Sequence, residues 1–301
     1  MKYRIALLPG DGIGPEIIEQ CVKILEAIEE KSDVSFQLNE YLIGAASIDE
    51  TGSPLIDETI EGSKNSDAIL FGAIGDPKYD NNPSSEVRPE QGLLALRKAL
   101  ALFANVRPVE SYPFLEHESP LKNDRISGAN MVFYRELTGG IYFGKKEEGI
   151  DYAYDTCEYS RMEVERLLKL AFEAAERRKG KLTVVDKANV MASSRLWRAV
   201  AKDMALDYPD VELDFLFVDN AAIQMIVNPK QFDVILTENM FGDIISDEAS
   251  VIGGSIGLLA SASTGSDKAL FEPIHGSYPQ AKGKGIANPI ASILSAAMLL
   301  D

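Results

Sequence analysis

Residues that cross-link a chain or bind zinc are scarce in this sequence, which has two cysteines, two histidines and one tryptophan among 301 residues. Cys21 and Cys157 stand in unlike contexts, and no metal-ligand spacing links them. A disulfide framework or a zinc domain is therefore excluded. We expect two free thiols, buried or half-buried, in a cytoplasmic protein.

Long hydrophobic runs are also lacking. No stretch reaches the ~20 apolar residues that a bilayer-spanning helix needs. Residues 1–10 hold two basic side chains and a short apolar run that ends in Pro9-Gly10, which is not the pattern of a signal peptide. We therefore expect neither secretion nor a membrane partner.

Positive charge is in deficit, with 30 Lys and Arg against 47 Asp and Glu and a net charge of −17. A nucleic-acid partner is excluded, because binding to phosphate backbones needs a surplus of Lys and Arg. A small anionic substrate remains compatible with this composition if basic side chains are concentrated in one site.

Apolar runs and helical spacings alternate along the chain. This alternation predicts an α/β fold with much parallel strand pairing, and the length favours two domains. A short strand is expected at 3–8, and buried strands are expected at 68–74, 131–134, 182–185, 213–218 and 234–236. The expected helices are one from Pro15 and those at 92–104, 160–178, 193–206 and 290–300. The polar stretch 144–156 is expected to be a projecting arm or loop.

The glycine turn after the first strand is not a Rossmann fingerprint. Its spacing is Gly10-x-Gly12-x-Gly14, whereas the dinucleotide motif is G-x-G-x-x-G. We also find no acidic residue that ends a second strand about 20 residues further on. A tight functional turn of another kind is predicted.

Three arginines follow or lie within apolar segments: Arg97 on the helix with Leu93 and Leu94, Arg107, and Arg135 at the end of a strand. Guanidinium groups bind carboxylates through paired charge-assisted hydrogen bonds, so three that converge would hold a dicarboxylate. The alternative is that each is a solvated or ion-paired arginine.

Asp243 and Asp247 are four residues apart, which places both carboxylates on one face of a helix. With Asp219, which follows the predicted strand 213–218, they form a candidate set of oxygen ligands for Mg²⁺ or Mn²⁺. The alternative is that Asp243 only stabilises the helix dipole.

Lys187 follows a predicted buried strand, where a lysine can act as a base because desolvation lowers its pKa; a structural ion pair is equally compatible. Tyr142, in a glycine-flanked segment, could donate a proton, or it could be an ordinary aromatic residue. His117 and His275 stand in unrelated settings, and a Ser-His-Asp hydrolase has no support.

Taken together, these segments resemble the isocitrate/isopropylmalate dehydrogenase family, and more closely its isopropylmalate branch. The resemblance covers essentially the whole chain and rests on these blocks: Leu7-Leu-Pro-Gly-Asp-Gly-Ile-Gly-Pro-Glu16, Arg88-Pro-Glu-Gln-Gly-Leu-Leu-Ala-Leu-Arg97, Arg135-Glu-Leu-Thr-Gly-Gly-Ile-Tyr-Phe-Gly144, Asp186-Lys-Ala-Asn-Val190, Phe241-Gly-Asp-Ile-Ile-Ser-Asp247, Glu272-Pro-Ile-His-Gly276 and Gly285-Ile-Ala-Asn-Pro289.

The resemblance implies a two-domain fold that is not of the Rossmann type. The first, cofactor-side domain would be discontinuous, comprising 1–102 and 255–301 and truncated at the C-terminus. The second domain, 103–254, would bind substrate and form a homodimer, with an arm near 139–158. Each active site would borrow Lys187 and Asp219 from the partner subunit.

The resemblance also implies oxidative decarboxylation of (2R,3S)-3-isopropylmalate to 4-methyl-2-oxopentanoate with reduction of NAD, a step of leucine biosynthesis. Arg97, Arg107, Arg135 and Asp219 would contact the diacid, and Leu93 and Leu94 would form an apolar wall for its isopropyl group. Asp219, Asp243 and Asp247 would bind Mg²⁺ or Mn²⁺. Tyr142, Lys187 and Asp219 would be catalytic.

The implied NAD site comprises Ile13, Gly75, Asp76, Glu90, Asn189, His275, Gly276, Gln280, Ala287 and Asn288. Gln280 stands where NAD-using members usually have aspartate, so it lacks the charge that repels a 2′-phosphate, and Lys282 is nearby. The rival interpretations are a sister enzyme for isocitrate, homoisocitrate, tartrate or 3-methylmalate, and a non-catalytic dimeric subunit.

Overall fold

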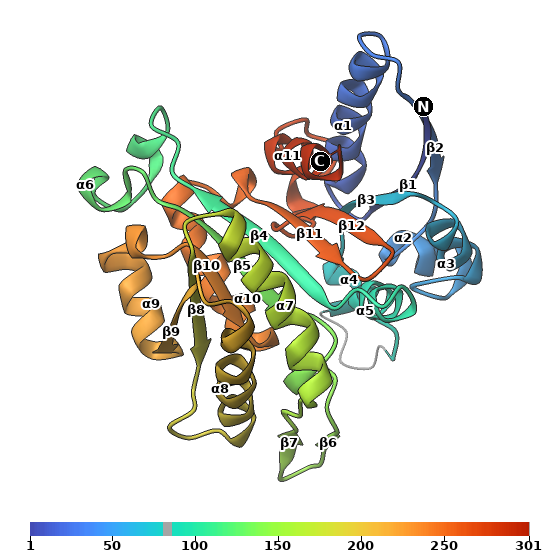
Figure 1. The fold of residues 1–301 in the computed structure, drawn as a ribbon. Helices are drawn as coiled ribbons and strands as arrows, with labels where there is room; N and C mark the ends of the chain where they lie inside the picture. Colours follow the sequence, from blue (N-terminus) through green and yellow to red (C-terminus); the bar gives the residue numbers. More distant parts are fainter. Residues whose placement is uncertain (81–85, 301) are drawn as a thin grey trace. The chain divides into compact units, whose positions relative to one another are not determined.

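Buried strands followed by amphipathic helices build two units, which the computed structural model describes over residues 1–80 and 86–300 (Figure 1). The first unit joins Met1–Leu102 to the segment that begins at Ile256, and the second unit is Phe103–Ser255. In each unit, helices cover the strands on both faces, the arrangement in which nearly continuous apolar strands are buried on both sides.

Within the first unit, the strands lie side by side in the order β2-β1-β3-β12-β11. β1 pairs in parallel with β2 and β3, β3 pairs in parallel with β12, and β11 and β12 form an antiparallel pair. The bounds are β1 Lys2–Gly10, α1 Gly14–Glu29, β2 Ser35–Glu40, α2 Ala45–Thr51, α3 Asp57–Lys64, β3 Ala68–Ala73, α4 Pro77–Asp80, α5 Pro89–Ala99, β11 Ala260–Thr264, β12 Ala269–Pro273 and α11 Ile290–Leu300, with 3₁₀ turns at Ile256–Leu258 (η6) and Pro279–Ala281 (η7).

Within the second unit, the strands lie side by side in the order β4-β5-β10-β8-β9. Among these pairs, only β4–β5 is antiparallel. The bounds are β4 Ala104–Glu110, α6 Asn123–Ile126, β5 Asn130–Glu136, β6 Lys146–Glu148, β7 Ala153–Asp155, α7 Arg161–Arg177, β8 Lys181–Asp186, α8 Ala192–Met204, β9 Glu212–Phe217, α9 Val218–Val227, β10 Val234–Thr237 and α10 Asn239–Ala249. Its 3₁₀ turns are Glu116–Glu118 (η1), Gly140–Tyr142 (η2), Ala205–Asp207 (η3), Pro229–Gln231 (η4) and Ser250–Gly253 (η5).

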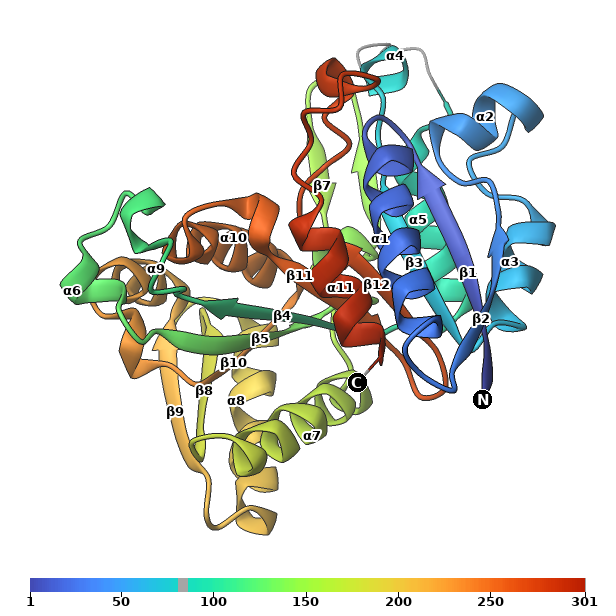
Figure 2. The same cartoon turned by 90° about the horizontal axis from the view of Figure 1, so that it is seen from above.

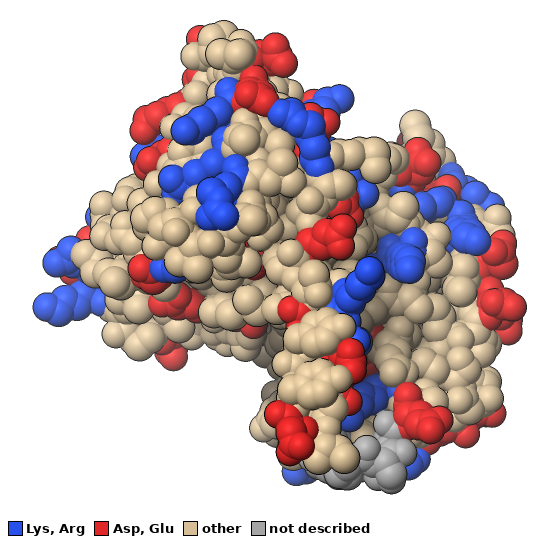
Figure 3. Space-filling view, turned by 90° about the horizontal axis from the view of Figure 1, so that it is seen from below, with Lys and Arg blue, Asp and Glu red and all other residues tan. Residues whose placement is uncertain are grey.

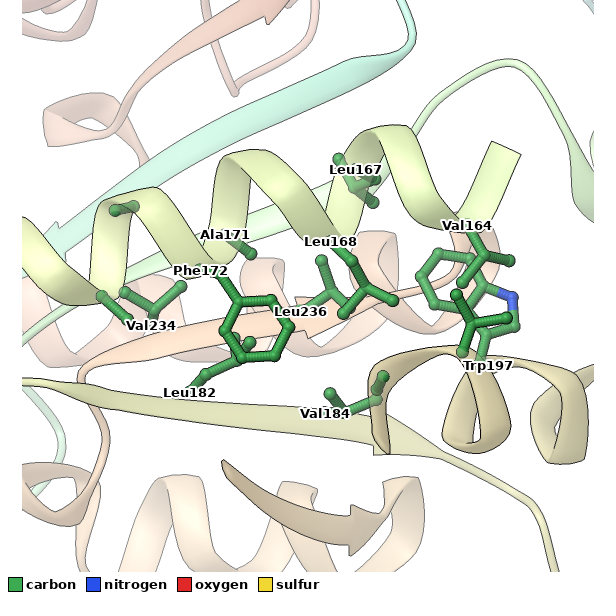
Figure 4. Close-up of a cluster of buried hydrophobic side chains, with 14 of the residues drawn as sticks. Val164, Leu167, Leu168, Ala171, Phe172, Leu182, Val184, Trp197, Val234 and Leu236 are labelled. Carbon is green, nitrogen blue, oxygen red and sulfur yellow. The ribbon is translucent and has the colours of Figure 1, made fainter. Parts of the chain in front are cut away.

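Helices α7 and α8 cover one face of the strands of the second unit, and α9 and α10 cover the other (Figures 1 and 2). The apolar stripe of α7, including Leu168 and Phe172, packs on Leu182 of β8 and Leu236 of β10 (Figure 4). Each fully buried side chain of this size stabilises the fold by about 1.5–3 kcal/mol. This core holds three neighbouring parallel strands, β5, β10 and β8, whose carboxyl ends point the same way and lie next to one another.

Three expectations about secondary structure were wrong. The helix predicted at 92–104 ends at Ala99, and Ala104 begins β4. The strand predicted at 213–218 is not buried, since β9 is an edge strand with partly exposed side chains, and Val218 begins α9. An acidic residue does end a second strand, because β2 ends at Glu40.

The expected thiols are confirmed, because Cys21 is buried, Cys157 is half-buried and both are free. Over residues 1–80 and 86–300, no helix combines the length and apolar character needed to cross a bilayer. The segment 144–156 forms the β6–β7 hairpin, whose strand residues are all exposed. On the face drawn in Figure 3, Lys and Arg side chains are interspersed with Asp and Glu.

Candidate active site

Asp243 and Asp247 lie on α10, which follows β10. The Glu238 carboxylate caps this helix by accepting a hydrogen bond from the Phe241 amide at 2.7 Å. The two aspartates are the fifth and ninth residues of α10, so neither is in the first turn. A role limited to the helix dipole is therefore excluded for Asp243, since that effect is confined to the first turn.

Arg107 of β4 and Arg135 of β5 meet at these aspartates. Arg107 Nη1 donates to Asp247 Oδ1 at 2.8 Å and to Ser246 Oγ at 2.7 Å, and its Nη2 lies 3.4 Å from Asp243 Oδ1. Arg135 Nη1 donates to the same Asp243 oxygen. The side chains of the two arginines are 9% and 6% exposed, so neither is a solvated surface residue. Two buried basic side chains thus lie close together in a protein whose net charge is negative.

The same contacts set the electrostatics of the aspartates. Burial raises the pKa of the Asp247 carboxyl, and the Arg107 charge opposes that shift. Carboxylate oxygens held this way are hard donors suited to Mg²⁺ or Mn²⁺. Two of them on one helix face fit part of a divalent-metal site.

Tyr142, in η2, joins this group from the glycine-rich loop after β5. Its hydroxyl donates to Asp243 Oδ2 at 3.2 Å. Burial, followed by the nearby Asp243 charge, raises the pKa of the phenol. The hydroxyl is therefore held in its protonated form, as a proton donor must be.

Lys187 directly follows the buried strand β8, as the sequence predicts, and its Nζ forms an ion pair with Asp219 of α9. The lysine holds the pKa of the Asp219 carboxyl below its usual value by a hydrogen bond. Within residues 1–80 and 86–300, no three His, Cys, Asp or Glu side chains are grouped as metal ligands. Asp219 therefore does not complete the pair Asp243 and Asp247 within one chain.

Arg97 belongs to the first unit, on α5. Its Nη2 donates to Glu272 Oε1 of β12 at 2.7 Å, and its side chain is 13% exposed. It is thus ion-paired within that unit. Its convergence with Arg107 and Arg135 on one diacid stays a prediction.

Several of the predicted cofactor residues lie close to one another in the first unit. The Ile13 amide donates to the Ser277 carbonyl at 2.8 Å, and Ser277 Oγ donates to the Gly75 carbonyl at 2.7 Å. A Cβ added at Gly75 would lie 2.8 Å from Glu90 Oε1. Ile13 also packs with Ala281 and the partly buried Ala287.

The backbone near this group is accessible. A Cβ at Gly276, Gly283 or Gly285 would meet no described atom within 4 Å, and Gln280 is exposed. An open backbone beside the Glu90 carboxylate and the Gln280 amide fits the polar groups of a nucleotide.

The remaining predicted cofactor residues make local contacts only or lie in the second unit. Asp76 and Asn288 accept hydrogen bonds from the Lys78 and Ile290 amides, which are local capping contacts. The ring of the half-buried His275 contacts the carbonyl oxygen of Gly276. Asn189 lies in the second unit, in the turn after β8.

A family model described as isocitrate/isopropylmalate dehydrogenase matches residues 4–301 of the sequence. The chain belongs to the isocitrate/isopropylmalate dehydrogenase family. The fold expected from the resemblance is confirmed as that of this family.

Relatives of this family are similar along the entire chain. A "3-isopropylmalate dehydrogenase" of Bacteroides fragilis is 57% identical, with 100% of this chain and 85% of the relative covered. One of Bacillus subtilis is 56% identical, with 100% and 84% covered.

Solved structures of the family have the same fold. Isocitrate dehydrogenase from Methylococcus capsulatus matches with a TM-score of 0.87 and 37% identity over 99% of this chain and 85% of that chain. A beta-decarboxylating dehydrogenase from Thermococcus kodakarensis matches with a TM-score of 0.80 and 39% identity, covering 99% and 83%.

Among the predicted substrate residues of this family member, Leu93 has a structural role. It is 8% exposed and packs in the core with Leu8, Phe71 and Leu96, whereas Leu94 is partly exposed. Of the pair, Leu94 is the one whose side chain is accessible to a substrate.

The sequence interpretation missed three side chains that hold the arginines: Asn105, Asn239 and Ser246. Asn105 precedes Arg107 by two residues on one strand, which places both on the same face. Asn239 precedes Asp243 by four residues on α10, again on a shared face. These spacings place Asn105 and Asn239 beside residues of the candidate site, but they are too common to indicate a role by themselves.

Proposed function

We propose that this protein oxidises and decarboxylates (2R,3S)-3-isopropylmalate to 4-methyl-2-oxopentanoate while NAD is reduced, a step of leucine biosynthesis. The observation that carries the proposal is the cluster of Arg107, Arg135, Asp243 and Tyr142, which offers guanidiniums, hard oxygen donors and a proton donor together. The names of relatives that are 52–57% identical supply the substrate.

Each polar side chain has a role in this reaction. Arg107 and Arg135 hold the carboxylates of the diacid, and Asp243 and Asp247, with Asp219, are the residues that hold Mg²⁺ or Mn²⁺. When bound, the nicotinamide would supply a hydride acceptor for C2, and the divalent cation would supply electron withdrawal at the C2 oxygen.

Protons move through two groups of the protein. Lys187, with Asp219 in contact, accepts the hydroxyl proton as C2 becomes a ketone. Loss of the β-carboxylate as CO₂ leaves an electron pair on C3, and the Tyr142 hydroxyl donates a proton there. A positioned acid or base of this kind contributes about 10²–10⁴-fold to the rate.

The active site is proposed to be shared between the subunits of a homodimer. Lys187 and Asp219 contact each other, so a partner subunit can deliver both as one unit. Ile223 and Ile226 of α9 and Ile244 of α10 are 58%, 44% and 60% exposed, which is an apolar surface suited to burial against a second copy. The exposed β6–β7 hairpin is the proposed arm. A cytoplasmic location fits the free thiols.

An assay of NAD reduction across a panel of 2-hydroxy di- and tricarboxylic acids with Mn²⁺ tests the proposal. We expect the highest kcat/KM with 3-isopropylmalate, no NADH without a divalent cation, and lower values with malate, tartrate, 3-methylmalate, homoisocitrate and isocitrate. A preference for isocitrate would identify a sister enzyme, and no turnover with any acid would indicate a non-catalytic subunit. Parallel runs with NADP test whether Gln280 preserves selectivity for NAD.

Replacing Leu94 by serine is expected to lower kcat/KM for 3-isopropylmalate about tenfold more than for malate. The reason is that the substrate's isopropyl group then loses apolar contact worth about 0.8 kcal/mol per CH₂. Steady-state kinetics with both acids measures the ratio. Ala95→Ser, at an exposed position of the same helix, is the control.

Equal losses with both acids in the Leu94→Ser variant would contradict the proposed pocket. Leu93→Ser has a different expected result, because Leu93 is in the core of the first unit. It should lower the thermal unfolding midpoint and impair both substrates alike.

A further inference from the structure

The two arginines of the second unit are held in the same way. Arg107 Nε donates to Asn105 Oδ1 at 2.6 Å. Arg135 donates from Nε at 3.1 Å and from Nη2 at 2.8 Å to Asn239 Oδ1. Both asparagines are 1% exposed, so their amide groups are buried within the protein.

Because the acceptors of Asn105 and Asn239 are neutral amide oxygens, they affect the charge of the site differently from carboxylates. An amide oxygen fixes the plane of a guanidinium without adding negative charge, whereas a carboxylate would fix it more strongly and neutralise it. Here two guanidiniums already face the two carboxylates of Asp243 and Asp247, so the formal charges of these four side chains cancel. One more carboxylate would remove one unit of positive charge from the site and would weaken its attraction for a dicarboxylate.

Asn239 also contacts the loop that carries Tyr142. Its Nδ2 donates to the Gly139 carbonyl at 3.2 Å, at the start of the loop that carries Tyr142. Buried Glu136 accepts a hydrogen bond from the Gly139 amide at 2.6 Å, so the N–H and the carbonyl of Gly139 are both hydrogen-bonded to buried side chains. Asn239 therefore connects the orientation of Arg135 to the position of the Tyr142 loop.

We infer that Asn105 and Asn239 are positioning residues that aim Arg107 and Arg135 at the carboxylates of the substrate while leaving the charge of the site unchanged. This inference rests on the proposed function, because it concerns the recognition of that diacid. Asn239 has the additional role of holding the loop of the proton donor Tyr142.

The near-isosteric variants Asn105→Asp and Asn239→Asp test the inference. Each keeps the Oδ acceptor for its arginine but adds a negative charge, so we expect KM for 3-isopropylmalate to rise at least about tenfold. In Asn105→Asp, kcat should change little. In Asn239→Asp, kcat should fall as well, because the donor to Gly139 is lost. This split between KM and kcat is the readout that a purely structural role would not produce.

A binding measurement makes the test independent of turnover. Calorimetric titration of 3-isopropylmalate with Mn²⁺ and without NAD should give a Kd that rises in parallel with KM. The matched control is Asn130→Asp at the amino end of β5, where Asn130 Oδ1 accepts from Arg178. It adds the same charge beside an arginine outside the site and should leave Kd, KM and kcat unchanged. If Asn105→Asp does not fold, the neutral variant Asn105→Ser takes its place. It removes the amide acceptor of Arg107, so Kd and KM should rise for this variant too.

The outcomes separate this inference from the proposed function. Turnover by the wild-type protein, with Kd and KM in both aspartate variants within about twofold of wild type, overturns the inference alone. The same increase in Asn130→Asp also overturns it, because the effect would then be a general charge effect. A wild-type protein that neither binds nor oxidises 3-isopropylmalate overturns both.

Discussion

Replacing Lys187 by methionine is expected to lower kcat for 3-isopropylmalate by about 10²- to 10⁴-fold, the usual contribution of a positioned base. Methionine keeps much of the apolar stem but lacks the Nζ, which lies 5.8 Å from the centroid of the Phe217 ring, so it cannot accept the hydroxyl proton. KM should change less than kcat, because Lys187 pairs with Asp219 and is not one of the arginines that bind the diacid. Steady-state kinetics of NADH formation measures both constants.

The control for this variant is Lys181→Met on the same strand. Lys181 begins β8, forms an ion pair with Glu212 at 3.2 Å and is 26% exposed, which is close to the 28% of Lys187. Loss of its partly exposed ion pair should cost at most about 1 kcal/mol of stability and leave kcat unaltered. If Lys187→Met retains more than a tenth or so of wild-type kcat, Lys187 is a structural lysine and not the base.

Periodicity predicted β1, β3, β5, β8 and β10 because these strands are covered on two faces and are read as apolar runs, whereas β2, β4, β11 and β12 were not predicted. It failed for the helix predicted at 92–104, which ends at Ala99, two residues before Ala101. This residue has a φ of 51°, in the left-handed region that alanine rarely adopts. The apolar side chains Leu102 and Phe103 continue the hydrophobic pattern past that point. Only the tertiary fold reveals that the chain changes direction there.

β9 illustrates a second limit of sequence interpretation. Its residues Leu213, Phe215 and Phe217 suggest burial, but the strand lies at the edge of the sheet with a neighbour, β8, on one side. Whether an apolar strand is central or at an edge depends on pairing order, which a local pattern does not contain.

The candidate site was predicted unevenly. Asp243, Asp247, Arg107 and Arg135 were identified from spacing and resemblance, and the structure places them in contact. The amides that orient the arginines were not identified, because asparagine beside an arginine is too common to indicate function. The burial and hydrogen bonds that distinguish Asn105 and Asn239 exist only in the folded chain.

Mixing two inactive variants is expected to restore activity if the site is shared between subunits. Asp219→Asn and Asp243→Asn should each lose nearly all NADH formation, because each removes one ligand charge from the proposed metal site. In a mixed dimer, one site combines the intact Asp219 of one subunit with the intact Asp243 of the other, and the second site carries both substitutions. Random exchange makes half of the dimers mixed, so roughly a quarter of wild-type activity should return.

The pairing of variants decides between a shared and a self-contained site. If each chain builds its own complete site, every site in the mixture carries one substitution and no activity returns. Asp243→Asn mixed with Asp247→Asn is the internal control, because both residues lie on α10 of the same chain. Their mixed dimers have one substitution in each site and should stay inactive. Far-UV circular dichroism shows that the subunits are folded, and native mass spectrometry with one variant labelled by ¹⁵N shows that mixed dimers formed. Persistent inactivity of Asp219→Asn with Asp243→Asn then contradicts the proposed exchange of Asp219 between subunits.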